Sequence, residues 1–237
     1  MWTGTRSDWT NQPRERAVRV PIEGLTLDAD LYIPDHPRGV VIFAEGSRSN
    51  RRSPSNRLVA GELQRAGFAT IIPDLLTPYE ERQDARTGRF RFDVDLLAAR
   101  LGAVTDWAIC EPALWSLPIG YFGGSTGAAA GIIAAARHPG VVRATVSRGG
   151  RPDFASRALT RIRCPTLLIV GEDDIPILEL NHGAVWKIGG HRVLQVVPHA
   201  THLLEEPGAP ERVASLARTW FDQHLARRRE SAQQGAW

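Results

Sequence analysis

The chain has 237 residues, 43% of them hydrophobic, which is enough to bury the core of one enzyme-sized domain. Its 29 basic residues, scattered rather than gathered in a stripe, face 26 acidic ones, and a net charge of +3 argues against a nucleic-acid-binding protein. No apolar run approaches the roughly 20 residues of a membrane span, the polar first residues do not resemble a secretory signal, and two cysteines give no disulfide framework. We therefore expect a cytoplasmic monomer or homodimer that binds a small molecule, and neither nucleic acid nor membrane.

Short apolar segments alternate with amphipathic segments along the chain. The segments expected as strands are 17–22, 25–33, 39–44, 68–73, 117–122, 141–146, 166–170 and 193–197, of which the first two form a hairpin. The segments expected as helices are 54–66, 93–110, 128–137, 177–186 and 210–226. This alternation predicts a single α/β domain over residues 17–229, a mostly parallel central sheet flanked by helices on both faces. Residues 1–16 and 230–237 are expected to be flexible.

The motif G-x-S-x-G occurs at residues 123–127, where it reads Gly-Gly-Ser-Thr-Gly. It lies between an apolar strand and an Ala-rich helical segment, the context in which a nucleophile elbow is found. A sharp turn there holds the serine in a strained conformation, and the glycines two residues before and after it remove side chains that would collide. The motif predicts Ser125 as a nucleophile.

A serine nucleophile needs a base, and the base needs an acid to orient it. In this fold class, the acid and the base follow the serine in that order, at the carboxyl ends of later strands. The segment after strand 166–170 supplies Asp173 and Asp174, and the segment after strand 193–197 supplies His199 and His202. The residues alone favour Asp174 and His202 and leave the other two as alternatives. No Cys/His spacing indicates a metal site, and no cofactor is expected.

Several stretches carry a family resemblance that extends from about Ala17 to about Ala226. They are residues 46–50 with 53–57, 68–70 with 74–77, 123–127, 147–153, 167–174 and 200–208. In these stretches the chain resembles the dienelactone-hydrolase-like family of α/β-hydrolases, which implies the α/β-hydrolase fold. The resemblance implies Ser125 as nucleophile, Asp174 as acid and His202 as base. It also implies an oxyanion hole made by the backbone N–H of Thr126 and by one in the loop after strand 39–44, at Ser47.

The chain departs from the family pattern at position 45, where Glu45 stands in place of the usual His before Gly46. The dienelactone hydrolases proper do place a Glu in this loop, but their nucleophile is usually Cys. Two interpretations stay open. Either Glu45 points aside and pairs with a nearby arginine such as Arg48 or Arg52, or its carboxylate lies within reach of the substrate.

Two arginines, Arg148 and Arg151, follow the strand 141–146 at its carboxyl end. A guanidinium group binds carboxylates through two parallel hydrogen bonds, so both residues are candidates for binding an acidic substrate. The alternative is that they tie loops together through Asp153 or Glu172.

Together these features predict a serine hydrolase that cleaves a small or medium carboxylic ester or lactone through an acyl-enzyme intermediate. A biosynthetic cyclase or acyl transferase that uses the same site is the first alternative. A non-catalytic binding protein on a hydrolase scaffold is the second.

Overall fold

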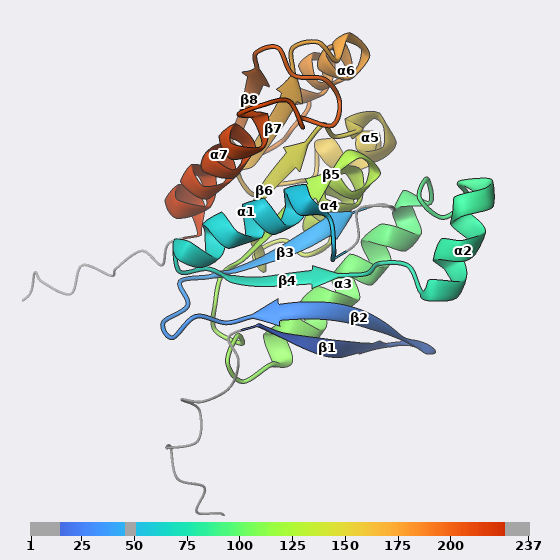
Figure 1. Cartoon of the computed structure of the whole chain (residues 1–237), viewed down its shortest axis with the longest axis vertical. Helices are drawn as coiled ribbons and strands as arrows, with labels where there is room; N and C mark the ends of the chain where they lie inside the picture. Colours follow the sequence, from blue (N-terminus) through green and yellow to red (C-terminus); the bar gives the residue numbers. More distant parts are fainter. Residues whose placement is uncertain (1–14, 46–50, 226–237) are drawn as a thin grey trace, which may run out of the picture.

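The computed structural model describes residues 15–45 and 51–225 (Figure 1). The strands are β1 (Glu15–Ile22), β2 (Leu25–Tyr32), β3 (Val40–Glu45), β4 (Ala69–Pro73), β5 (Ile119–Gly124), β6 (Val142–Arg148), β7 (Thr166–Gly171) and β8 (Arg192–Val197). The helices are α1 (Pro54–Arg65), α2 (Pro78–Thr87), α3 (Val94–Cys110), α4 (Ser125–Arg137), α5 (Ser156–Leu159), α6 (Ile175–Val185), α7 (Ala209–His224) and the 3₁₀ helix η1 (Pro152–Ala155).

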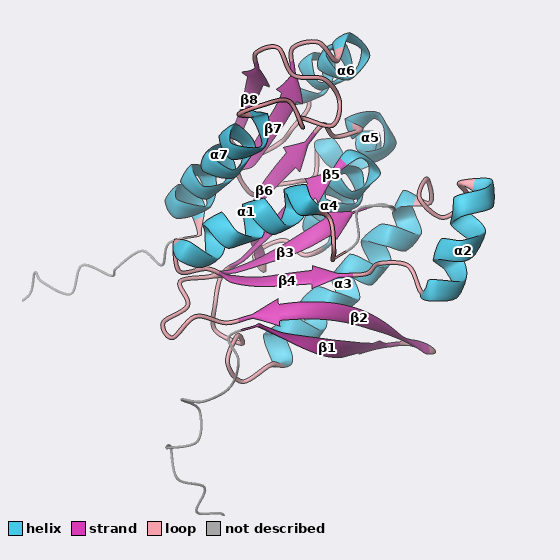
Figure 2. Ribbon diagram, viewed as in Figure 1, coloured by secondary structure: helices cyan, strands magenta, loops and turns pink. Residues whose placement is uncertain are grey.

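The strands form one sheet in the order β1-β2-β4-β3-β5-β6-β7-β8. The hairpin β1–β2 joins β4 in antiparallel fashion, and every pair from β4 through β8 is parallel. The fold class expected from the alternation of apolar and amphipathic segments is therefore confirmed. Because β3 to β8 run in one direction, their carboxyl ends meet at a single edge of the sheet (Figure 2).

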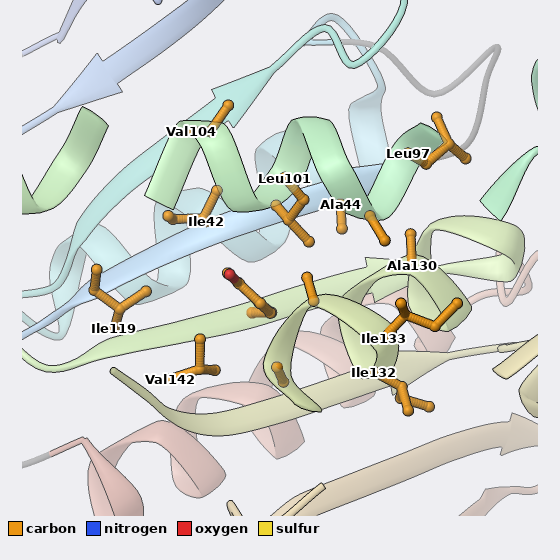
Figure 3. Packing of buried hydrophobic residues seen from close by; sticks show 14 of the residues in the cluster. Ile42, Ala44, Leu97, Leu101, Val104, Ile119, Ala130, Ile132, Ile133 and Val142 are labelled. Carbon is orange, nitrogen blue, oxygen red and sulfur yellow. The ribbon is translucent and has the colours of Figure 1, made fainter. Parts of the chain in front are cut away.

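Two apolar layers fill the space between the sheet and its helices. On one face, side chains of α3 and α4 pack against β3, β5 and β6, as Figure 3 shows for Leu101 and Val104 of α3 beside Ile42 and Ile119. On the other face, α1 and α7 pack against each other and against the sheet around Phe43, Phe122 and Phe221. Packing in these two layers holds in place the sheet edge that carries the site residues predicted from the sequence. No helix in the described ranges is both long and apolar enough to cross a membrane.

Helix α2 was not predicted from the sequence, and neither were η1 and α5. The residue that α2 buries is the polar Asp84, so the helix has no apolar stripe to reveal it. Its N-terminus is a reciprocal cap, in which the Thr77 hydroxyl accepts the Glu80 N–H and the Glu80 carboxylate accepts the Thr77 N–H. The same carboxylate accepts hydrogen bonds of 2.7 and 2.6 Å from Arg100 of α3. Polar contacts thus hold this helix in place, and a search for hydrophobic periodicity does not detect them.

The Glu80–Arg100 pair makes the stability of the α2 region depend on pH. Hydrogen bonds from Arg100 and from Thr77 lower the pKa of Glu80 from 4.5 to about 2, against the opposing effect of burial. A lowered folded-state pKa contributes stability that is fully present above the unfolded value and is lost as the pH falls toward 2. We expect Glu80→Gln to destabilise the protein by about 1 kcal/mol at pH 7. In thermal unfolding, this difference should shrink between pH 4.5 and pH 2.

The matched control is Glu81→Gln on the same helix. Burial is the main cause that raises the pKa of Glu81, so its charged form is disfavoured by folding and removal of the charge should not destabilise the protein at pH 7. An equal loss in both variants, or a loss for Glu80→Gln that is independent of pH, would contradict the assignment.

Candidate active site

Ser125 sits at a sharp turn between β5 and α4, with a backbone φ of +50° that non-glycine residues rarely adopt. The flanking glycines leave no room for side chains. A Cβ on Gly127 would lie 2.1 Å from the carbonyl oxygen of Ala44, and one on Gly123 would lie 2.8 Å from Cα of Ala128. The serine is only partly buried, whereas its neighbours on both sides are buried. The turn therefore presents one hydroxyl at the carboxyl edge of the sheet.

The loops after β7 and β8 bring one acid and one histidine together. Nδ1 of His202 lies 2.7 Å from Oδ2 of Asp174, whose side chain is 11% exposed. Of the two alternatives, Asp173 is exposed, and its backbone N–H donates to the carbonyl of Ala200. The side chain of His199 is 92% exposed and lies 3.7 Å from Glu172. Asp174 and His202 alone among these candidates have the arrangement that orients an imidazole.

The turn after β6 contacts both the serine and the histidine. The N–H of Arg151 donates to the carbonyl oxygen of Ser125 at 3.2 Å. Gly149, with a φ of +53°, lies so close to His202 that a Cβ would be 3.1 Å from its carbonyl oxygen and 3.6 Å from its Cε1. Thus residues after β5, β6, β7 and β8 meet within one small region of the sheet edge.

Of the two groups expected in the oxyanion hole, Thr126 is placed and Ser47 lies outside the described residues. Thr126 follows Ser125 in the first turn of α4, where backbone N–H groups have no partner within the helix. Its N–H is therefore available to an oxyanion at the serine.

Glu45, Gly124 and Arg148 form a row across three adjacent strands, since Glu45 is in register with Gly124 and Gly124 with Arg148. Gly124 carries no side chain, so Nη2 of Arg148 reaches across it to Oε1 of Glu45 at 3.2 Å. Nη1 of Arg148 donates to Ser55 at 2.9 Å. The two charged side chains are only 8% and 12% exposed. Glu45 thus pairs with Arg148, 103 residues away in the chain. Of the two arginines suggested by the sequence as partners, Arg48 lies outside the described residues.

Arg151 contacts Asp153 rather than the other candidate residues. Its Nε and Nη2 donate to the two carboxylate oxygens at 2.9 and 2.6 Å, and its guanidinium lies 4.4 Å from the ring centre of Phe154. The hydrogen bonds from Arg151 lower the pKa of Asp153. This is the contact that the loop-tying alternative requires.

A metal-dependent site would need several His, Cys, Asp or Glu side chains close together. Among residues 15–45 and 51–225, no group of three or more such side chains could hold a metal ion.

Comparison with known proteins gives matches over most of the chain. A model of the dienelactone hydrolase family matches residues 27–225. The crystal structure of a dienelactone hydrolase from Anabaena variabilis has 49% sequence identity and a TM-score of 0.88, and the match covers 91% of this chain and 100% of that one. The esterase Est1E from Butyrivibrio proteoclasticus has a TM-score of 0.71 at 15% identity, over 87% of this chain and 98% of that one. The second likeness concerns the fold alone.

Curated relatives from Mycobacterium tuberculosis are named putative phosphoribosyl transferases. They are 52% identical over 212 residues, which is 90% of this chain and 47% of theirs. The chain therefore spans about half the length of these relatives.

The row of Glu45, Gly124 and Arg148 gives a testable consequence for stability. A Cβ on Gly124 would lie 2.8 Å from both Nη2 of Arg148 and Oε1 of Glu45, so Gly124→Ala must push the two charged groups apart. Separation of a buried ion pair is strongly destabilising, and we expect a loss of about 2–4 kcal/mol in denaturant unfolding.

The matched control is Gly183→Ala in α6, where a Cβ would meet nothing within 4 Å. Alanine has the higher helix propensity, so this variant should be neutral or more stable by up to about 1 kcal/mol. Similar effects of the two substitutions would show that the ion pair does not need the gap at Gly124.

Proposed function

Because this chain belongs to the dienelactone hydrolase family, we propose that it cleaves a small or medium carboxylic ester or lactone through an acyl-enzyme intermediate. The observation that carries the proposal is the 2.7 Å contact between His202 and Asp174, at the sheet edge where the strained, partly buried Ser125 lies. This acid–histidine pair and the serine at the nearby turn supply the three residue types that an activated serine hydroxyl requires.

In the proposed reaction, Ser125 attacks the substrate carbonyl carbon while Nε2 of His202 takes the serine proton. Asp174 holds the Nδ1–H tautomer and stabilises the imidazolium that forms. The oxyanion accepts a hydrogen bond from the N–H of Thr126, together with one from the loop after β3. His202 then returns the proton to the leaving alcohol, and a water molecule activated by the same histidine releases the acid.

The charges beside the elbow bear on the substrate class. A bare carboxylate at Glu45 would oppose the negative charge of the oxyanion, but Arg148 compensates it at 3.2 Å. The guanidinium of Arg148 is in turn engaged by Glu45 and Ser55, and that of Arg151 by Asp153. Since both arginines are already engaged, we propose a neutral ester or lactone rather than an acidic one.

The residues that follow the acid and the base bear on the shape of the substrate. Ile175, next to Asp174, is 55% exposed, and Leu203, next to His202, is 59% exposed. Exposed apolar surface beside the reacting groups can be covered by an apolar part of the substrate, which removes it from water. We therefore propose that the substrate places an apolar acyl or alkoxy group against them.

Phosphoribosyl transfer, which the curated relatives' name implies, has weaker support in this chain. Those proteins are about twice as long, and this chain corresponds to 47% of them. The Ser125, His202 and Asp174 arrangement gives ester hydrolysis a mechanism within the described residues, so hydrolysis is the function that we propose.

The experiment that tests the proposal is hydrolysis of neutral activated esters of several acyl lengths, with a fluorophosphonate probe as a reporter of the serine. We expect Ser125→Ala and His202→Ala each to lower kcat at least about a thousandfold, with Ser125→Ala also abolishing labelling. Asp174→Asn should be similarly severe, because it favours the wrong imidazole tautomer.

Asp173→Asn and His199→Ala are the matched controls, since these residues neighbour the proposed triad without joining it. Both should keep turnover within about threefold of the parent, a small effect in activation free energy. A crippled Asp173→Asn beside an active Asp174→Asn would reassign the acid, and a fully active Ser125→Ala would end the proposal.

A separate prediction concerns the charge pair. We expect Glu45→Gln to keep turnover of a neutral activated ester within about tenfold, or about 1.4 kcal/mol, because the triad is untouched. The same change leaves the Arg148 charge uncompensated, so kcat/KM for an anionic ester should rise relative to that for its neutral counterpart. The double variant Glu45→Gln/Arg148→Gln removes both charges and should restore the original ratio. An unchanged ratio in Glu45→Gln would mean that Arg148 does not face the substrate.

A further inference from the structure

The turn Arg148–Gly149–Gly150–Arg151 contacts both Ser125 and His202. Its Arg151 N–H bonds to the serine carbonyl at 3.2 Å, and its Gly149 lies against the imidazole. A displacement of this turn would therefore change the position of His202 relative to the Ser125 hydroxyl. Whatever holds the turn in place also sets the geometry of proton transfer.

Asn181, in the middle of α6, holds this turn. Its side chain is fully buried, and its Nδ2 donates to the carbonyl oxygen of Gly150 at 3.0 Å and to that of Ile177 at 2.8 Å. The second bond lies within the helix, four residues back. The first crosses from α6 to the turn and fixes the peptide that joins Gly150 to Arg151.

The buried amide of Asn181 is a poor choice for stability compared with an apolar side chain of similar shape. Its Oδ1 is buried and has no hydrogen-bond partner among the described residues. A buried polar atom without a partner costs free energy that an apolar side chain of similar shape would avoid. The amide nevertheless supplies one thing that an apolar side chain cannot, namely a donor aimed at the Gly150 carbonyl.

The other backbone hydrogen bonds of the turn lie at its two ends, from the Gly149 N–H to Ile169 and from the Arg151 N–H to Ser125. A Cβ on Gly150 would lie 1.9 Å from Oγ of Ser147 and 3.0 Å from Cβ of Ala128, so no side chain can be added there to pack it. Gly149 has its N–H bonded to Ile169 at 2.8 Å, which fixes the start of the turn. Asn181 fixes its middle.

We propose that Asn181 is a positioning residue for catalysis. By holding the Gly150 carbonyl, it fixes the turn on which the His202 ring rests and so keeps the imidazole within reach of Ser125. Asn181 contacts neither the substrate nor the reacting atoms. The proposal rests on the proposed roles of Ser125 and His202.

Two variants that lack the donor to Gly150 but differ in their effect on stability test the proposal. Asn181→Leu leaves the Gly150 carbonyl without its donor but also removes the unpartnered oxygen, and because these two effects offset each other its Tm should stay close to that of the parent. Asn181→Ser can still bond within the helix to the Ile177 carbonyl, but it leaves a cavity and should lower the Tm. In both, we expect kcat per active site to fall about 10- to 100-fold, with KM within about threefold, because small misplacements of reacting groups have effects of this size.

The number of active sites is measured by titration with a fluorophosphonate, and kcat is then determined per titrated site with a neutral activated ester. A purely structural role would lower the number of sites and leave kcat per site unchanged. Thr105→Val is the matched control, since Thr105 is also a buried helical residue that bonds a carbonyl four residues back and one group outside its helix, the Tyr121 hydroxyl. It should change kcat per site less than about twofold.

The possible results distinguish a failure of the positioning role of Asn181 from a failure of the proposed hydrolase function. Wild-type kcat per site in either Asn181 variant, or a loss that follows the Tm rather than the missing donor, would overturn the positioning role while the triad stands. Absence of fluorophosphonate labelling and turnover in the wild-type protein would instead overturn the proposed function.

Discussion

Helix α4 packs so closely on strand β3 that a Cβ on Gly127 would lie 2.1 Å from the carbonyl oxygen of Ala44. At this close approach Ser125, the first residue of the helix, has its positive φ. Thr126 lies in the same first turn, where backbone N–H groups have no partner within the helix. The partly buried serine and the proposed oxyanion donor therefore both lie where this helix approaches the neighbouring strand.

A second constraint is that charges at the sheet edge are compensated locally. Arg148 compensates Glu45 across Gly124, and Arg151 compensates Asp153. Away from the serine, Arg51 donates to Asp74 at 2.8 Å and to Asp30 at 2.9 Å, which ties the start of α1 to the ends of β2 and β4. With these charges compensated, the helix N-terminus and the backbone donors are the groups that would stabilise the proposed oxyanion.

The sequence predicts those parts of the protein that follow local rules. Strands and amphipathic helices follow from apolar periodicity, and the elbow follows from glycine spacing. The choice of Asp174 over Asp173 is different, because adjacent residues in one acidic turn have the same composition and differ only in where the turn points them. The structure separates them through the 2.7 Å contact with His202.

The long-range contacts could not be predicted from the sequence, and the reason is physical. The pairing of Glu45 with Arg148 depends on the order of β3, β5 and β6 in the sheet and on a register that no local pattern encodes. Helix α2 is held by Arg100 and Glu80 rather than by an apolar face. The sequence does not distinguish Asn181 from other polar residues of a helix, because its contact with Gly150 depends on how α6 packs against the turn after β6. Knowledge of the strand order would have been enough to suggest the Glu45–Arg148 pair. The contacts of Arg100 with Glu80 and of Asn181 with Gly150 require the packed structure.

The described loops differ in whether they carry residues of the proposed triad. Ile175 and Leu203 adjoin Asp174 and His202 directly, so changes to these apolar residues also act on the loops that carry the reacting groups. The segment that joins α2 to α3 carries none of those groups. Its Phe92 is 54% exposed and lies 6.1 Å, ring centre to ring centre, from Phe154 of the segment after β6. Because polar bonds from Arg91 and Arg100 anchor this segment independently of the elbow, its exposed surface can vary without moving Ser125. The sequence of the α2 region can therefore vary with little effect on the residues of the proposed triad.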